Sequence, residues 1–170
     1  MDYSKELNID LGKAICYSGY RKGQTPGEIF PTYNQVKEDL LIICKTWKYI
    51  RLYSCDFHSK TVLEVIKNEN LSLRIMLGCY IEAEINNYSC PWGGEYSEDQ
   101  LEINKKRNLQ RIDLLAKFGN EYPNIIFLFP LEMKLVLAGL IIWFQLKVLL
   151  SMQKLSKLKP HNQLLFVKTM

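Results

Sequence analysis

Residues 75–81 read Ile75-Met76-Leu77-Gly78-Cys79-Tyr80-Ile81, a run without a charged side chain. Short continuous apolar runs of this kind are typical of parallel strands that are covered on both faces. The pattern predicts a buried strand over residues 73–81. It is the third of four such segments along the chain.

The other three segments have the same character. Residues 14–19 are an apolar run between two glycines, residues 49–54 are a second run, and residues 124–127 follow the turn signal Pro123-Asn124. Between them, apolar residues recur at helical spacing among charged ones. We expect helices over about residues 36–47 and 60–68, and a third that starts at the capping box of residues 97–100 and ends at Gly119-Asn120. The core stripe predicted for this third helix is Leu101, Leu109, Ile112, Leu115 and Ala116.

Strands and helices that alternate in this order predict an α/β fold, with a parallel sheet and right-handed crossovers. The net charge of +4 is too small to indicate a nucleic-acid-binding protein. Its distribution is uneven, however. Residues 1–129 hold 16 Lys and Arg against 17 Asp and Glu, whereas residues 130–170 hold six Lys and one acidic residue. The composition therefore divides the chain into a domain of residues 1–129 and an unrelated tail of residues 130–170.

The five cysteines, at positions 16, 44, 55, 79 and 90, contain no C-x-x-C pair, and the two histidines lie far apart at positions 58 and 161. Neither a disulfide framework nor a metal site is indicated, and no cofactor is expected. Residues 1–6 have neither a basic nor an apolar region, so no secretory signal is expected and a cytoplasmic location is the default.

The tail contains a strongly apolar run, residues 135–150, which Gln145 and Lys147 interrupt. A bilayer-spanning helix needs about 20 apolar residues. Three interpretations fit the run, and we rank them in this order: the product of a shifted reading frame, a helix on a membrane surface, and a short membrane anchor. Basic residues that follow the run would help it to adhere to anionic lipid: Lys154, Lys157 and Lys159.

Aromatic, arginine and carboxylate residues follow the predicted strands, where the chemistry of parallel α/β barrels is found. They suggest a lining that binds sugar, although each residue could instead pack or form a surface ion pair. The candidate substrate-binding residues are Tyr17, Tyr20 and Arg21, then Arg51 and Tyr53, then Tyr80 and Glu82. Cys55, Asp56 and His58 have the residue types of a catalytic triad, but close neighbours in sequence cannot easily form its relay.

Three segments, residues 14–24, 50–54 and 75–81, resemble the first three strands of the bacterial branch of glycoside hydrolase family 17. The resemblance covers about residues 12–127. It implies the first four β/α units of a (β/α)8 TIM barrel, which typically needs about 250 residues in full. It also implies retaining hydrolysis of β-glucans, mostly β-1,3-linked, by an intact family member.

The fourth strand of that family leads into Ser-Val-Gly-Asn-Glu, in which the Glu is the general acid/base. Residues 128–134 instead read Leu128-Phe129-Pro130-Leu131-Glu132-Met133-Lys134. When each codon is read from its third base, this stretch permits Ile-Ser-Val-Gly-Asn-Glu-Ala, with the Glu formed across Met133 and Lys134. A frame change after about Phe127 is therefore expected. Under this interpretation the chain has no catalytic residue, because Glu132 lies in a stretch that does not match the family motif.

The expected protein is thus a truncated, inactive β-glucanase-like hydrolase whose intact form acts on a β-glucan or a related oligosaccharide. The alternative is a non-catalytic remnant that binds sugar or associates with a membrane.

Overall fold

The computed structural model describes residues 10–86, 88 and 94–129. The tail of residues 130–170, with its predicted helix and membrane contact, lies outside the described residues, as does Cys90. Within the described ranges, no helix has the length and apolar character that crossing a membrane requires.

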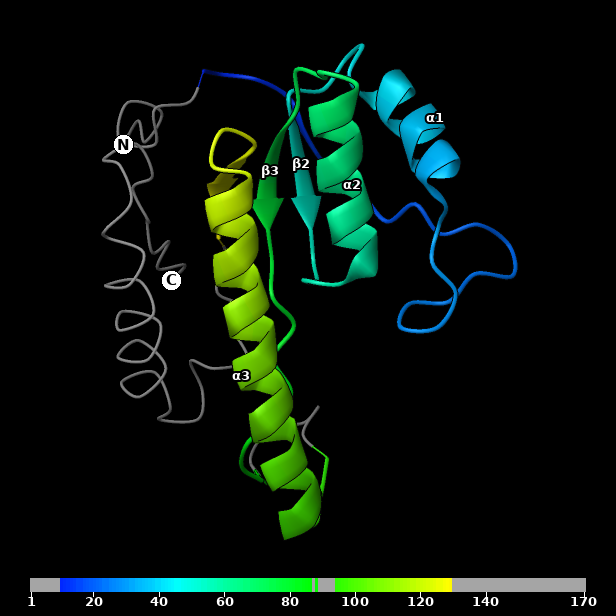
Figure 1. Ribbon diagram of the computed structural model, residues 1–170. Helices are drawn as coiled ribbons and strands as arrows, with labels where there is room; N and C mark the ends of the chain where they lie inside the picture. Colours follow the sequence, from blue (N-terminus) through cyan, green and yellow to red (C-terminus); the bar gives the residue numbers. More distant parts are fainter. Residues whose placement is uncertain (1–9, 87, 89–93, 130–170) are drawn as a thin grey trace.

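Strands and helices alternate along the chain, as the sequence predicts (Figure 1). The elements are β1 (Ala14–Cys16), α1 (Tyr33–Ile43), β2 (Tyr49–Leu52), α2 (Phe57–Asn68), β3 (Arg74–Leu77), α3 (Glu98–Glu121) and β4 (Ile126–Leu128). Each strand is shorter than its predicted segment. Strands β1, β2 and β3 end earlier, because the chain leaves the sheet and forms loops at its carboxyl edge, whereas β4 starts later, after a turn that extends to Ile125.

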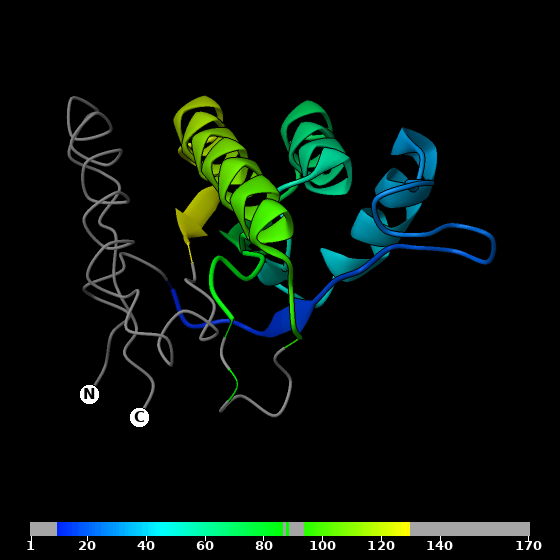
Figure 2. The ribbon, with the colours of Figure 1, turned by 90° about the horizontal axis from the view of Figure 1, so that it is seen from below.

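The four strands form one parallel sheet in the order β1-β2-β3-β4. The spatial order of the strands equals their order in the chain, so each strand pairs with the next one and the strand order does not reverse. Figure 2 shows the three helices side by side on one face of this sheet. This is the arrangement expected when every crossover has the same hand.

A row of isoleucines crosses the helix-covered face of the sheet. In the strand registers, Ile15 pairs with Ile50, Ile50 with Ile75, and Ile75 with Ile126. The row belongs to one hydrophobic cluster together with side chains of α1 and α2. Because side chains alternate along a strand, the neighbouring residues Tyr49, Arg74 and Phe127 lie on the opposite face. There the Phe127 ring is 5.1 Å from the Tyr49 ring, and the Arg74 guanidinium is 5.3 Å from the Phe127 ring.

The first two helices start earlier than their apolar patterns predict, because polar residues cap them. Thr32 forms a capping box with Gln35 at the start of α1. Asp56 accepts a hydrogen bond from the Ser59 backbone N–H at 3.0 Å and so begins α2 three residues before the predicted start. Helix α1 also ends at Ile43, four residues before the predicted end.

Helix α3 begins at the predicted Ser97 cap but differs from the prediction in two respects. It does not end at Gly119-Asn120 and runs to Glu121. Gly119 is buried under Phe129, whose ring lies 2.9 Å from where a Cβ would be, so this glycine allows close packing and is not a stop signal. Leu109 is 38% exposed and does not belong to the core stripe, whereas Asn104 and Asn108 are buried.

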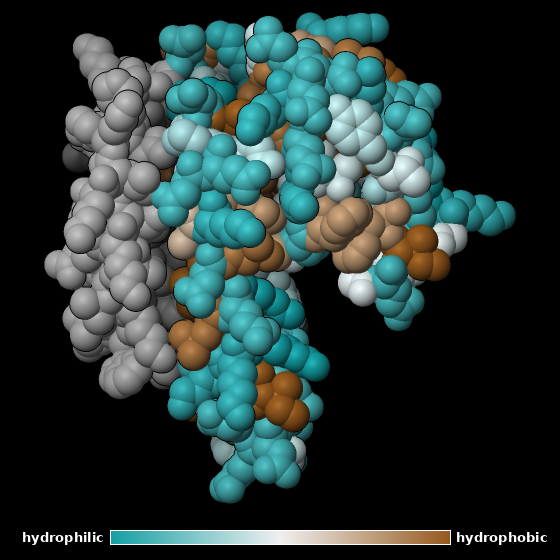
Figure 3. All heavy atoms as spheres, in the orientation of Figure 1, coloured by the Kyte–Doolittle hydropathy of each residue, from teal (hydrophilic) through white to brown (hydrophobic). Residues whose placement is uncertain are grey.

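The 24 residues of α3 far exceed the length of the strands, at about 36 Å for 1.5 Å per residue. Its N-terminal half therefore projects beyond the carboxyl edge of the sheet (Figure 1). In Figure 3, hydrophilic side chains dominate the exposed surface of this helix, with isolated hydrophobic side chains among them. The projecting half supports the loop that follows β3.

Candidate functional site at the carboxyl edge of the sheet

The predicted site residues follow β1, β2 and β3 and lie at the carboxyl edge of the sheet. They form three separate groups, each with its own partners. The first group contacts α1 and α2, the second lies on the open face of the sheet, and the third is attached to α3.

In the first group, Tyr17 and Arg21 meet at Asp39 of α1. The Tyr17 hydroxyl donates to Asp39 Oδ2 at 2.8 Å, and the Arg21 guanidinium pairs with Asp39 Oδ1 at 2.7 Å and with Glu38 at 3.0 Å. Burial, and next its hydrogen bond to Asp39, raises the pKa of Tyr17 well above its ordinary value. These contacts anchor the loop between β1 and α1 to the helix.

Tyr20, from the same loop, packs against His58 of α2, with ring centroids 5.1 Å apart. Burial, and next the charge of Asp56, raises the pKa of Tyr20 to about 12. Its hydroxyl is buried and has no hydrogen-bond partner among the described residues.

The second group is the pair Arg51 and Tyr53. Arg51 alternates with the buried Ile50 and Leu52, so it lies on the face of the sheet that the helices leave open. Its guanidinium stacks on the Tyr53 ring at 4.8 Å. Tyr53 is 46% exposed, and its position at the end of β2 makes it available to a ligand.

Gly78 brings the ends of β2 and β3 together. Its backbone N–H donates to the Leu52 carbonyl at 2.7 Å. A Cβ at this position would lie 2.8 Å from that carbonyl oxygen and 3.1 Å from the carbonyl oxygen of Tyr53. The missing side chain therefore sets the close approach of the two strands that precede Tyr53 and Tyr80.

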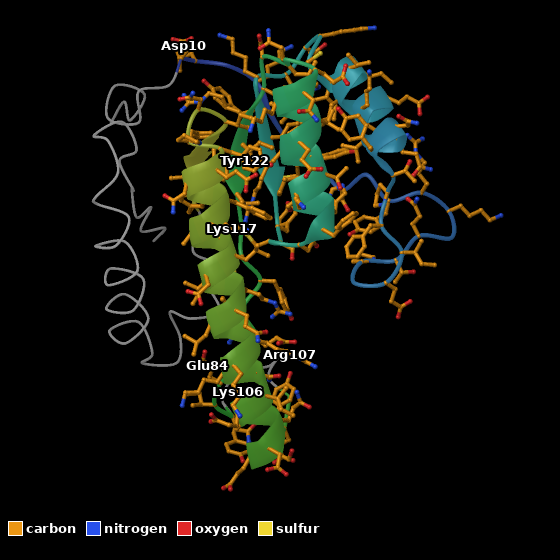
Figure 4. All side chains as sticks on the ribbon, viewed as in Figure 1. Asp10, Glu84, Lys106, Arg107, Lys117 and Tyr122 are labelled. Atoms are coloured by element: carbon orange, nitrogen blue, oxygen red, sulfur yellow. The ribbon has the colours of Figure 1, made fainter. Side chains whose placement is uncertain are left out.

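The third group is Tyr80 and Glu82, which α3 attaches through two arginines. Arg111 lies 5.6 Å from the Tyr80 ring and 3.1 Å from a Glu82 carboxylate oxygen. Arg107 lies 3.8 Å from the other oxygen of Glu82. Figure 4 shows Arg107 and Glu84 beside the N-terminal half of the helix.

Two buried asparagines on α3 complete this attachment. Asn108 accepts from the Glu82 backbone N–H, and its amide group donates to the Glu82 carbonyl and to the Glu84 carboxylate, at distances of 2.9, 2.9 and 3.0 Å. Asn104 donates to the Ala83 carbonyl at 2.9 Å. Neither asparagine belongs to the predicted core stripe or to the predicted site, although their spacing of four positions places both on one face of the helix.

Cys55, Asp56 and His58 do not form a relay. The Asp56 carboxylate caps α2, and Cys55 is buried, which raises the pKa of its thiol well above the ordinary value. Over residues 10–86, 88 and 94–129, no group of three or more His, Cys, Asp or Glu side chains could hold a metal ion.

No protein family profile and no curated protein sequence matches the chain. Among solved structures, the crystal structure of an endo-laminarinase from Formosa Hel1_33_131 matches with a TM-score of 0.63 and 21% sequence identity. The described fold is similar to that of a TIM-barrel glycoside hydrolase. The match covers 89% of this chain and 40% of the laminarinase, so the chain spans less than half the length of that enzyme. The predicted fold class, a parallel α/β sheet of consecutive β/α units, is confirmed.

Proposed function

We propose that the chain is the front half of a family 17 β-glucanase-type barrel, whose intact form hydrolyses a β-1,3-linked glucan. The observation that carries the proposal is the pair of exposed tyrosines at the ends of two adjacent strands. Tyr53 and Tyr80 are 46% and 45% exposed, and an arginine stacks on each ring. Flat aromatic rings bordered by charged hydrogen-bond donors suit a sugar, which presents apolar ring faces and hydroxyl groups. The laminarinase-like fold supports the same assignment.

The chain itself is proposed to bind glucan without hydrolysing it. Retaining hydrolysis needs two carboxyl groups about 5 to 5.5 Å apart, one as acid/base and the other as nucleophile. The acid/base of the family belongs after β4, where residues 128–134 depart from the motif. Glu82 and Glu84 do not replace it, because α3 engages both through Arg107, Arg111 and Asn108.

The lost motif is proposed to result from a frame change after about Phe127. The nucleotide sequence across codons 127–135 is the direct test. A third-base frame that stays open and encodes Ile-Ser-Val-Gly-Asn-Glu-Ala is the expected result, whereas a stop codon soon after would contradict it. A chain with the frame restored and extended through the second half of the barrel, which would supply the nucleophile, should hydrolyse laminari-oligosaccharides. Turnover by the 170-residue chain would contradict its proposed inactivity.

Binding of laminari-oligosaccharides to the 170-residue chain, measured by calorimetry, tests whether the carboxyl edge of the sheet binds glucan. Tyr53→Ala and Tyr80→Ala should each weaken binding about tenfold, which corresponds to about 1.4 kcal/mol. Tyr88→Ala is the control, because Tyr88 is exposed but lies in the middle of the loop between β3 and α3 and not at the end of a strand, and it should leave the affinity unchanged. Equal losses in all three variants, or no binding by the parent chain, would overturn the assignment.

The second candidate, a membrane-associated remnant, rests on the apolar run 135–150 and the lysines that follow it. Flotation of the chain with vesicles that contain anionic lipid is its test. Flotation that disappears when residues 135–159 are deleted would favour this candidate.

A further inference from the structure

An aromatic cluster at the base of the loop between β1 and α1 surrounds one histidine. The cluster comprises Tyr17 and Tyr20 from the start of the loop, Phe30 from its end, and Phe57 and His58 from the first turn of α2. The His58 ring lies 5.5 Å from the Tyr17 ring and 5.1 Å from the Tyr20 ring. Phe30 lies 6.3 Å from Tyr20 and 5.5 Å from Phe57, so both ends of the loop rest on α2.

His58 is only 5% exposed, and its Nε2 has no hydrogen-bond partner among the described residues. A buried polar group without a partner favours its neutral form, because a charge in this position would lose its hydration. The closed cluster therefore favours the neutral form of the His58 imidazole.

Charged groups approach His58 from two helices and from the loop. Asp56 caps the helix of His58 itself. Asp39 of α1 accepts a hydrogen bond from Tyr17, and Arg21 of the loop pairs with Asp39. The two carboxylates favour a protonated imidazole, but burial outweighs them and lowers the pKa of His58 below its ordinary value. The two tyrosines remain uncharged across the acidic and neutral range, because burial raises the pKa of each.

We propose that His58 is an acid-sensitive latch: when the imidazole takes up a proton, the aromatic cluster separates and the loop between β1 and α1 opens. In the open state the imidazolium regains water and lies two residues from the Asp56 carboxylate. The ion pair of Arg21 with Asp39 does not depend on His58, so it keeps the loop attached to α1 while the aromatic contacts are lost. The proposal concerns this loop alone and stands whether or not the chain binds a glucan.

The direction of the pH effect follows from proton linkage. An open cluster binds a proton with the ordinary histidine pKa of about 6.5, whereas the closed cluster binds it more weakly. The latch is therefore fully effective above about pH 6.5 and weakens as the pH falls. The opening equilibrium should increase by up to about tenfold per pH unit until the closed form is itself protonated.

The direct test is an NMR titration of the 170-residue chain carrying His161→Gln, which leaves His58 as the only histidine. Its imidazole signal should titrate with a midpoint below 6.5. Amide exchange, expressed as protection factors at several pH values, reports the opening. Protection of the Tyr17 amide, which bonds to the Arg51 carbonyl, should decline with acidification, while protection of the Ile75 amide between β3 and β4 should not.

His58→Phe supplies a ring that cannot take up a proton, and protection of Tyr17 in this variant should be independent of pH between 5 and 7.5. If this variant does not fold, His58→Met serves the same purpose, and the titration of the parent chain needs neither. An imidazole midpoint at or above 6.5, or protection of Tyr17 and Ile75 that declines in parallel, would overturn the proposal.

Discussion

The side-chain amide of Asn108 hydrogen-bonds both the backbone N–H and the backbone carbonyl of Glu82, each at 2.9 Å. One helix residue thus satisfies both polar groups of a loop residue, as a neighbouring strand would do. The loop after β3 is in effect paired with α3 along the part of the helix that projects beyond the sheet. The position of Tyr80 and Glu82 therefore depends on a helix residue that follows them by more than 20 positions.

Asn108→Ala should destabilise the chain by about 2 to 3 kcal/mol, because it removes three hydrogen bonds and leaves Glu82 backbone groups without their partner. Urea unfolding followed by circular dichroism measures the change. Asn120→Ala, at an exposed position of the same helix, is the matched control and should cost less than about 0.5 kcal/mol. Equal effects of the two substitutions would show that the loop does not depend on the Asn108 amide.

Gly78→Ala should destabilise by about 1 to 3 kcal/mol, because the added Cβ meets backbone oxygens that cannot move without separating β2 from β3. Gly94→Ala is the control, since the atoms nearest to a Cβ there belong to the side chain of Tyr96, which is exposed, and not to the backbone. Thermal unfolding of both variants gives the comparison. A stable Gly78→Ala chain would mean that the two strands do not approach each other as closely as described.

Tyr17→Phe removes the hydroxyl that donates to Asp39 and should cost about 1.5 to 3 kcal/mol, as for other hydrogen bonds to charged groups. The same residue predicts a loss of stability in alkali. Its pKa in the folded chain is raised above the unfolded value of about 10, so its contribution is complete below pH 10 and is lost as the pH rises further.

Urea midpoints between pH 9 and 11.5 should therefore fall more steeply for the parent chain than for Tyr17→Phe. Tyr20 and Tyr122, whose pKa values burial raises to about 12, contribute a remaining slope in both chains. Tyr88→Phe, at an exposed position, is the matched control. Identical slopes for the parent and Tyr17→Phe would contradict the buried hydrogen bond.

Native alkylation should separate the cysteines by burial. Cys16 is exposed on β1, whereas Cys55 and Cys79 are buried beside the helices, and burial raises the pKa of the Cys55 thiol. Because the thiolate is the reactive form, Cys16 should react more than about tenfold faster than the two buried residues. Peptide mass spectrometry after a short pulse of iodoacetamide measures the order, and the difference should vanish in urea. Fast labelling of Cys55 in the native chain would contradict its burial.

The sequence predicts the order of strands and helices correctly, because each apolar run records a face that must be buried. It predicts the start of α3 for a local reason, since Ser97 and the acidic residues after it suffice as a cap. The ends are harder to predict. Gly119 has the signature of a helix stop, but its burial under Phe129 depends on where β4 returns, which no local pattern encodes.

The candidate site is less predictable still. Position after a strand selects Tyr53 and Tyr80, which are exposed, but it cannot distinguish them from Tyr17, whose hydroxyl is bound to Asp39 of α1. The partners come from distant positions, such as Arg111 for Tyr80 and Asp39 for Tyr17. Buried polar side chains such as Asn108 are missed, because apolar spacing selects the neighbouring Leu109 as the core position, whereas Leu109 is exposed.

Each strand of the sheet pairs only with strands that are adjacent to it in the sequence, and this order suits folding during synthesis. Each strand finds its partner in the unit synthesised just before it, so the registers of β1 to β4 can form progressively as the polypeptide leaves the ribosome. None of these pairings uses a residue beyond Leu128. A change of reading frame after that point therefore leaves every residue of these strand pairings in place.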